Sequence, residues 1–554
     1  MRIIKILFLF LFFLISCQSK EKRAKLFIQK HTNEVAPIAK ELNLAYWEAT
    51  AKGEEALYNK YAELELKLRK IYSRKDEFKE LKKLKESGKI KDPEIKRQID
   101  LLYLSYFGNQ IDEKLLEEIV KLSSEIEGKF NTFRAEFEGQ RVPDNTLSEV
   151  LKNEINVERR KMAWEASKMV GEEVSEKLKE LIKLRNKAAK SLGFSNYYEL
   201  ELYLSEQNLE EIFLIFDKLA EIAEPSFIKL KDNIDENLAK KYKIKKSDLR
   251  PYHYQDFFFQ EIQAIGNVNM DDYLKEKDVK QIVENFYTHI NLPVIKMLEK
   301  SDLYERDGKY QHAYCIDIDR EGDVRTMCSV RNNRYWLETL MHELGHGVYS
   351  MNVSSNLPWL LREEAHIFTT EAIAELFGSL PTTPLWLIEF AEIPVEVVEK
   401  WRPTLEMEKK MGLLIFCMWS EVMVHFERAL YEDPDQDLNT LWWDLVEKYQ
   451  KVKRIEGRDK PDWAAKIHLT SSPVYYHNYM LGNLLAAQLL YKMAEQVGVE
   501  APSMISFKTK PELGNFLKEK IFTFGKLYPW NELIERATGE PLNPEYFAKE
   551  VQIQ

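Results

Sequence analysis

Residues 335–350 read YWLETLMHELGHGVYS, and this segment decides the fold around it. Apolar side chains recur in it every three or four residues, at Trp336, Leu337, Leu340, Met341, Leu344 and Val348. That period predicts a helix with one buried face. Side chains at positions i and i+4 share a face of a helix, about 6 Å apart along its axis. His342 and His346 are therefore expected to project side by side.

The run His342-Glu343-Leu344-Gly345-His346 has the HExxH spacing of a metal-binding helix. Two imidazoles on adjacent turns can bind one Zn²⁺ at ~2.1 Å each. Glu343, beside the first imidazole, can act as general base toward an attacking water. The alternative interpretation is a structural helix with two core histidines, and a third ligand downstream weighs against it.

The sequence after this helix offers glutamates as that third ligand, which a hydrolytic zinc site needs besides an open fourth position. The candidates are Glu363, Glu364, Glu371 and Glu375. The metzincin pattern is excluded, because positions 349 and 352 are Tyr and Asn instead of Gly and His. Glu371 and Glu375 share a helical face, so one can bind the metal while the other orients a ligand imidazole. Glu363 and Glu364 are expected to face solvent or to pair with Arg362.

The rest of the chain is predicted to be mainly α-helical. Amphipathic patterns run over 54–73 and 147–192. Gly and Pro number only 20 and 19 among 554 residues, so few residues interrupt helices. One β-hairpin is expected, because alternating runs at 313–318 and 324–328 flank Glu321-Gly322-Asp323. We therefore expect one large, mainly helical body with a small antiparallel sheet.

Charge and hydropathy exclude two classes of protein. The net charge of −11 argues against a nucleic-acid partner, which favours a basic face. No apolar run in the sequence is long enough for a transmembrane helix.

The amino terminus is expected to be an export signal. Arg2 and Lys5 precede an apolar run over 6–15, and Leu14-Ile15-Ser16-Cys17 resembles a bacterial lipoprotein box. This predicts a signal peptide over 1–17, a lipid on Cys17 that anchors the exported protein to a membrane, a tether over 18–25 and a peptidase domain over 26–554. The alternatives are a plain signal peptide or a short uncleaved anchor.

Export would place the remaining cysteines in an oxidising compartment. Cys315 and Cys328 flank the predicted turn, so a disulfide between them is compatible with the sequence. The alternative is packed free thiols, which is the expectation for Cys417 in its apolar helical run.

Three motifs together resemble the angiotensin-converting-enzyme family of peptidyl-dipeptidases. They are HELGH at 342–346, EAIAE at 371–375 and KIHLTSSPVYYHNY at 466–479. Weaker similarities lie at 163–165, 193–194 and 312–313. The resemblance implies two helical lobes around a deep substrate channel, with a small sheet beside one zinc ion per chain.

The resemblance also implies a role for individual residues. The zinc ligands would be His342, His346 and Glu371, with Glu375 supporting a ligand and Glu343 activating the water. The groups that act on the peptide would be His468 and Tyr479 toward the tetrahedral intermediate, Lys466 and Tyr476 toward the terminal carboxylate, Gln260 beside them by a loose alignment, and the backbone of Ala313 toward an extended peptide.

The chain departs from the family pattern at three places. The spacing from His468 to the tyrosine pair is one residue longer, so Tyr475 is an alternative to Tyr476. Asn478 stands where the family has a chloride-binding Arg, so chloride activation does not carry over to this chain. Cys315 follows the His-Ala dipeptide instead of preceding it, so a matching disulfide does not carry over either. A bacterial branch of the family, or a link to oligoendopeptidases of the thimet type, would account for all three.

The sequence therefore predicts an exported zinc peptidase that removes dipeptides from the carboxyl end of short peptides. One alternative is a thimet-like oligoendopeptidase that ignores the terminal carboxylate. A non-enzymatic alternative is a surface lipoprotein that binds peptides on a degenerate protease scaffold. The expected partners are short peptides and, through the lipid, a membrane, with no nucleic acid.

Overall fold

The computed structural model describes residues 20–262, 266 and 268–553. Cys17, the predicted signal peptide and the first residues of the predicted tether lie outside them. Across the described residues the fold is mainly α, as predicted, with two antiparallel sheets of two strands each. None of the described helices combines the length and the apolar character needed to cross a membrane.

The helices follow one another through the chain, with long connections before α11, α14 and α19. Before the β3–β4 hairpin the helices are α2 (Lys20–Lys52), α3 (Glu55–Tyr72), α4 (Lys75–Lys85), α5 (Pro93–Gly108), α6 (Glu113–Thr132), α7 (Asp144–Asn153), α8 (Val157–Ser191), α9 (Tyr197–Leu204), α10 (Leu209–Tyr242), α11 (Asp271–Leu274), α12 (Val279–His289) and α13 (Ile295–Lys300). After that hairpin the helices are α14 (Arg334–Asn352), α15 (Ile367–Gly378), α16 (Pro384–Glu389), α17 (Val395–Glu432), α18 (Leu438–Leu445), α19 (His468–Ser471), α20 (His477–Val497), α21 (Glu512–Lys520), α22 (Trp530–Thr538) and α23 (Glu545–Val551).

The pattern over 147–192 forms two helices where the sequence suggested one. Helix α7 ends at Asn153 and α8 begins at Val157. The carboxylate of Glu154 accepts the backbone N–H groups of Ile155 and Asn156 at 2.8 and 2.9 Å, and Asn156 then caps α8. A carboxylate that satisfies these backbone donors competes with helix continuation, so the break follows from local hydrogen bonds.

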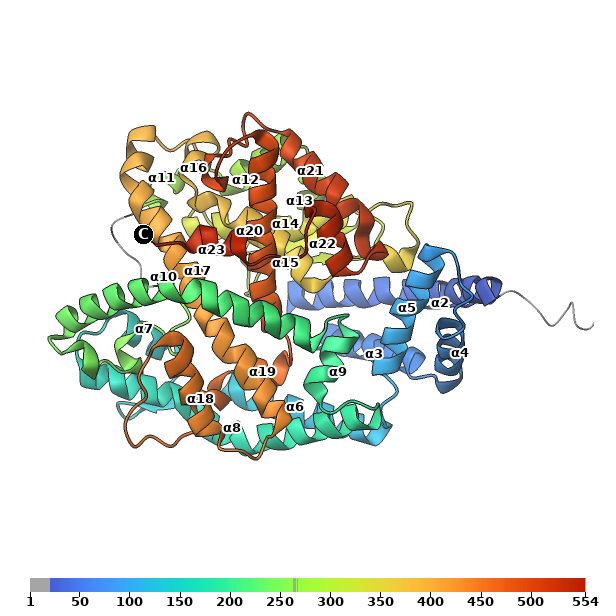
Figure 1. The fold of residues 1–554 in the computed structure, drawn as a ribbon, viewed down its shortest axis with the longest axis horizontal. Helices are drawn as coiled ribbons and strands as arrows, with labels where there is room; N and C mark the ends of the chain where they lie inside the picture. Colours follow the sequence, from blue (N-terminus) through green and yellow to red (C-terminus); the bar gives the residue numbers. More distant parts are fainter. Residues whose placement is uncertain (1–19, 263–265, 267, 554) are drawn as a thin grey trace, which may run out of the picture.

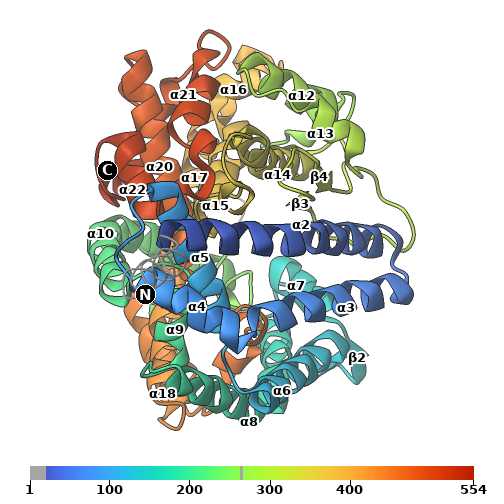
Figure 2. The same cartoon turned by 90° about the vertical axis from the view of Figure 1, so that its right-hand side faces the viewer.

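Two groups of helices lie one above the other in Figures 1 and 2. The upper group holds α12–α16 and α20–α23, and the lower group holds α6–α9, α18 and α19. The long helix α17 runs from the upper group into the lower one (Figure 1). One hydrophobic core extends through both groups, whereas α2–α5 share a smaller core of their own.

Helix α2 runs between the upper and the lower group (Figure 2). It begins at Lys20, so residues 20–25 of the predicted tether are already helical. Its carboxyl-terminal half lies on the hairpin of β3 (Tyr314–Asp317) and β4 (Val324–Met327), whose register pairs Tyr314 with Met327. The polar contacts between α2 and the hairpin are Lys40 Nζ to Asp319 Oδ2 at 2.9 Å, Asn43 Nδ2 to the Asp317 carbonyl at 3.0 Å and Thr50 Oγ1 to Tyr314 OH at 2.5 Å. Trp47 packs on Ile318 and Met327 beneath them.

The other sheet, β1 (Ala135–Phe137) with β2 (Gln140–Val142), lies far from the HExxH helix in sequence and packs against α8. The predicted hairpin is confirmed at 314–317 and 324–327, with Gly322 at φ +97° in the turn. Cys315, Cys328 and Cys417 are all free thiols, so the structure contains no 315–328 disulfide.

Candidate active site

Helix α14 holds the HExxH segment against the core. Asn333 caps its amino end by accepting the Trp336 N–H at 2.9 Å, and the predicted apolar face is buried. His342 and His346 lie one turn apart, with ring centroids 5.0 Å from each other. Burial lowers the pKa of both imidazoles, that of His346 to about 3. Both rings are therefore neutral at physiological pH, which is the form that binds a metal.

Small residues bring Glu371 to the two imidazoles. Gly345 on α14 lies so close to α15 that a Cβ there would meet Ala374 Cα at 2.8 Å, and a Cβ at Gly482 on α20 would meet Glu371 Cγ at 3.0 Å. Glu371 Oε1 lies 3.9 Å from His342 Nε2, and its Oε2 lies 3.7 Å from His346 Nε2. Close helix packing at glycines thus places three ligand atoms together.

The donor set fits a zinc ion. Ligand atoms of His342, His346 and Glu371 all lie within 4.8 Å of one another. Donors ~2.1 Å from a tetrahedral metal are about 3.4 Å apart, so only a small contraction is needed. Burial, and next the neighbouring Glu375 carboxyl, raise the pKa of Glu371. A cation would relieve this crowding of carboxylates.

Side chains lie behind both imidazoles, and one of them, Thr370, is within hydrogen-bond distance. The Thr370 hydroxyl lies 2.8 Å from His346 Nδ1, and Glu375 Oε1 lies 4.0 Å from His342 Nδ1. Groups that hold the far nitrogen of a ligand imidazole fix its tautomer and direction. Glu375 was expected here from the sequence. Thr370 was missed, although it directly precedes Glu371 on the same helix.

Glu343 faces the cavity between the helices and the hairpin, where it is only 8% exposed. Burial raises the pKa of its carboxyl to about 8. A carboxyl with a pKa near neutral can take up a proton in one step and release it in the next. Ala313, just before β3, lines the same cavity with the strand that follows it.

Glu363 and Glu364 are partly buried and pair with residues other than Arg362, which itself lies beside Glu321, so the expected pairing was wrong. Glu363 pairs with Arg320 and with Lys526, the latter at 2.5 Å, and Ser350 donates to Glu364. These partners are distant in sequence, so a local pattern could not show them.

Tyr479 lines the cavity that contains Glu343, and His468 lies in the cavity next to it. The rings of His468, Tyr476 and Tyr479 form a chain, with centroid distances of 5.2 Å and then 5.5 Å. Burial, and next Lys466, lower the pKa of His468 to about 4, so its ring is neutral and donates one N–H. Its Nδ1 has no hydrogen-bond partner among the described residues. Both side chains can therefore donate toward a peptide.

Lys466, Gln260 and Tyr476 meet although they are far apart in sequence. Lys466 Nζ donates to Gln260 Oε1 at 2.7 Å and lies 5.4 Å from the Tyr476 ring centre. Gln260 is placed by a turn in which the Asp256 carboxylate accepts its backbone N–H at 3.0 Å. Trp419 Nε1 donates to Tyr476 OH at 2.6 Å. The three predicted residues form one polar cluster.

The structure separates the two neighbouring tyrosines. Tyr475 lines the cavity that contains the imidazoles, with its ring 5.1 Å from that of Tyr479. Tyr476 instead lies beside Lys466, so it is the tyrosine of the Lys466 cluster. Asn478 accepts from Gln207 Nε2 at 2.9 Å, a neutral contact between two amides.

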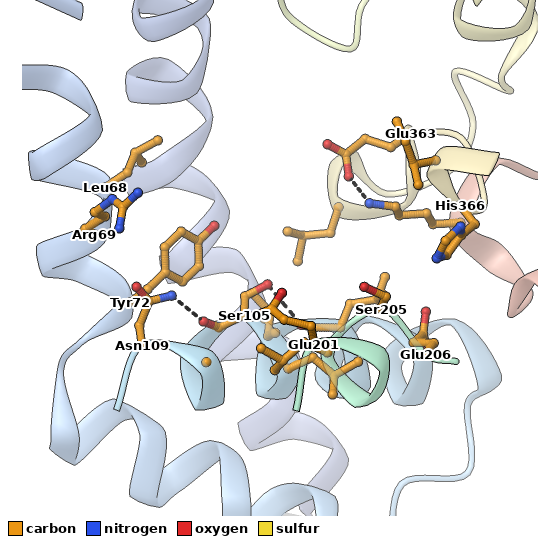
Figure 3. A pocket seen from close by; sticks show the side chains of 18 of the residues that line it. Leu68, Arg69, Tyr72, Ser105, Asn109, Glu201, Ser205, Glu206, Glu363 and His366 are labelled. Atoms are coloured by element: carbon orange, nitrogen blue, oxygen red, sulfur yellow. Dashed lines mark hydrogen bonds and ion pairs between the residues drawn. The ribbon is translucent and has the colours of Figure 1, made fainter. Parts of the chain in front are cut away.

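Three cavities lie at the site or next to it, and we call them the catalytic, the anchor and the distal cavity. The catalytic cavity, of about 830 Å³, contains His342, Glu343 and His346. The anchor cavity, of about 490 Å³, contains His468 and Tyr476 and shares Glu371 and Tyr479 with the catalytic cavity. The distal cavity, of about 880 Å³, lies between α3, α5, α9 and the start of α15 (Figure 3).

Two family models match this chain. The model described as peptidase family M3 matches residues 150–553, which include every residue of the site. The model described as angiotensin-converting enzyme matches residues 18–254. The resemblance drawn from the motifs is thereby confirmed at the level of these related peptidases. The strong motifs nevertheless lie in the part matched by family M3.

Curated relatives match over shorter stretches. Thermostable carboxypeptidase 1 of Pyrococcus furiosus is 30% identical over 121 residues, covering 21% of this chain and 23% of the relative. Carboxypeptidase 1 of Bacillus subtilis is 24% identical over 271 residues, covering 44% of this chain and 53% of the relative. The chain thus spans about half or less of the length of either relative.

Proposed function

Because this chain belongs to peptidase family M3, we propose that it is a zinc-dependent peptidase that removes dipeptides from the carboxyl end of oligopeptides. The observation that carries the proposal is the pairing of two sites. The cluster His342, His346 and Glu371 has the donors for zinc, and the Lys466 cluster in the adjoining region has the donors for a carboxylate. Relatives named carboxypeptidases support action from that end of a peptide.

Zinc held by these three residues would act as a Lewis acid on the scissile carbonyl and lower the pKa of the attacking water. The water oxygen adds to the scissile carbonyl carbon as Glu343 takes a proton from the water, and Glu343 then passes this proton to the leaving amine nitrogen. The amide bond then breaks with the proton on the departing dipeptide. His468 and Tyr479 donate hydrogen bonds to the carbonyl oxygen as it gains negative charge.

Binding residues decide which bond meets Glu343. Lys466, Gln260 and Tyr476 would hold the terminal carboxylate, and the backbone beginning at Ala313 would pair with the extended peptide. We expect no chloride activation, since Asn478 stands where the resembling family has a chloride-binding Arg and its amide accepts from Gln207.

Two alternatives make different predictions. An oligoendopeptidase would not need the Lys466 cluster, and the family M3 match keeps this alternative open. A peptide-binding lipoprotein would not need Glu343.

The test uses the purified protein, a peptide with a free carboxyl terminus and its amidated twin, with products identified by mass spectrometry. Successive loss of dipeptides from the free acid alone is expected, together with about one zinc per chain and loss of cleavage in Glu343→Gln. Internal cuts in both peptides would favour the oligoendopeptidase. Bound zinc without any cleavage would favour the binding protein, and absence of zinc would refute the proposal.

We also propose that the chain is exported and anchored by a lipid on Cys17, on the sequence pattern alone. Cys17→Ser is expected to move the protein from the membrane fraction to the soluble fraction. Unchanged fractionation would refute the anchor without touching the catalytic proposal.

A further inference from the structure

The distal cavity continues from the catalytic cavity. Their shared lining residues are Leu68, Tyr72, Arg320, Trp359, Glu363, Glu364, Ile367 and Thr370. The anchor cavity shares residues with the catalytic cavity but none with the distal one. The three cavities therefore form a row with Glu343 in the middle one.

Lys466 Nζ lies 5.4 Å from the ring of Tyr476, which lines the anchor cavity. If the carboxyl end of a peptide is held there, as proposed above, this order fixes the direction of the bound peptide. The chain of the substrate then passes Glu343 and continues toward the distal cavity with its amino-terminal part. The walls there suit such an occupant, since leucines from three helices line them: Leu68, Leu101, Leu104, Leu200 and Leu204. Leucine surfaces favour apolar side chains, because contact removes both from water.

Most charged groups of the distal cavity already have partners. Figure 3 shows Glu363 and His366 on one side, with Ser105 and Glu201 opposite them. Glu363 is paired with Arg320 and Lys526, as described above. Glu206 pairs with Arg97, whose Nη2 lies 2.8 Å from Glu206 Oε2.

Glu201 differs from these groups. Among the described residues it has no ion pair. Its carboxyl shares a hydrogen bond with the Tyr197 hydroxyl, and Arg185, the one cation that acts on it, donates to the Leu469 and Thr470 carbonyls at 3.0 and 2.7 Å. Burial raises the pKa of the Glu201 carboxyl. A partly buried carboxylate without a cation gains from one that arrives with a ligand.

We propose that the distal cavity binds the amino-terminal end of an oligopeptide substrate, whose ammonium group pairs with Glu201. This inference rests on the proposed peptidase function. It adds a second end-group site, so that the two ends of a peptide of suitable length are recognised at the two ends of the row of cavities.

The experiment compares peptides that share a carboxyl-terminal sequence and lengthen toward the amino end, each with a free and with an acetylated amino terminus. The protein variants are Glu201→Gln and, as a matched control, Glu199→Gln, which lies on the same helix α9 but does not line the cavity. Two quantities are measured: kcat/KM, and the Kd of the uncleaved peptide on Glu343→Gln protein with and without Glu201→Gln.

The expected result is a rise in kcat/KM at one peptide length, for the free amine only. Glu201→Gln should abolish that rise, with a loss of about tenfold or more, the usual effect of losing a charged hydrogen bond. Tripeptides, acetylated peptides and Glu199→Gln should be unaffected. In a second variant, Ser105→Trp, the indole should occupy part of the distal cavity, which Ser105 lines, and weaken binding of long peptides while tripeptide cleavage persists.

If Glu201→Gln changes kcat/KM equally for free and acetylated peptides, the pairing of Glu201 with the ammonium group is refuted. If Ser105→Trp affects long and short peptides equally, the distal cavity is not the binding site. Failure of the proposed function itself looks different. In that case no tripeptide is cleaved, whereas the Kd measurements need no turnover and still decide whether the distal cavity binds an amino terminus.

Discussion

Replacing Lys466 by Met should selectively impair cleavage of peptides with a free carboxyl terminus. Lys466 is 8% exposed and already lies beside Gln260 and Tyr476 before any peptide binds. Met retains much of the length and the apolar contact with the surrounding rings while removing the charge. The loss should therefore report the charge and its hydrogen bonds rather than a collapse of the cavity.

The size of the effect follows from the environment of Lys466. Two unit charges ~3 Å apart at an effective dielectric constant of about 20 attract by about 5 kcal/mol. Burial lowers the pKa of Lys466 to about 8, so its ammonium has already lost hydration in the free enzyme. Desolvation of the peptide carboxylate offsets about 2 kcal/mol of the attraction. A net of about 3 kcal/mol corresponds to a roughly 150-fold lower kcat/KM.

The assay measures kcat/KM for a free-acid peptide and its amidated twin. Lys409→Met is the control, because Lys409 lines the anchor cavity but pairs with Glu550 at 2.7 Å. It should change either value by less than about threefold, as for weak surface pairs.

The pH profile gives a second readout of the same charge. The protonated form of Lys466 is the one that binds a carboxylate, so kcat/KM for the free acid should fall as the pH rises through about 8. The ratio of free acid to amide removes any pH effect common to both peptides. Equal losses for the two peptides in Lys466→Met, or no loss, would refute the anchor.

Three further predictions concern other parts of the molecule. Thr370→Val should weaken zinc binding about 10- to 100-fold by freeing His346 Nδ1, as competition with a chelating dye would show; unchanged affinity would refute the orienting role. Gly345→Ala forces a Cβ against Ala374 and should lower the free energy of unfolding by about 1–3 kcal/mol in urea, whereas an unchanged midpoint would mean that the helices separate freely. Burial raises the pKa of the Glu427 carboxyl to about 8 from an ordinary value near 4.5, so the folded state holds a proton there that the unfolded chain releases, and this group costs more stability as pH rises from 4.5 to 8. Glu427→Gln should therefore gain about 3 kcal/mol relative to wild type between pH 5 and 7.5, and a difference independent of pH would contradict this.

The sequence predicted the metal-binding helix because its information is local. The period of apolar residues around His342 and His346 sets the buried face, and the spacing of the histidines sets their geometry. Glu371 was harder to identify, because Glu363 and Glu364 have the same chemistry. Only the crossing of α14, α15 and α20 at Gly345 and Gly482 selects Glu371.

Other features depend on contacts that no local pattern contains. Gln260 reaches Lys466 through a turn built on Asp256, so a loose alignment could suggest the pair but not its geometry. The choice between Tyr475 and Tyr476 depends on where Trp419 lies. The break between α7 and α8 was missed, because the apolar period continues across residues whose backbone donors bind the Glu154 carboxylate.

The contacts between helix α2 and the β3–β4 hairpin determine how often the site can open between these two elements. Its contacts with the hairpin through Lys40, Asn43 and Thr50 contribute about 1 kcal/mol each, and burial of Trp47 adds about 2 kcal/mol or more. Lifting the helix then costs at least about 5 kcal/mol, so fewer than about one molecule in 1,000 is open at any moment. For the proposed activity, a peptide that enters by one end would need no such opening, whereas an internal loop of a folded protein would need it. The contacts of Lys40, Asn43, Trp47 and Thr50 would thus select substrates by length and flexibility through their rate of access, before any residue of the substrate is recognised.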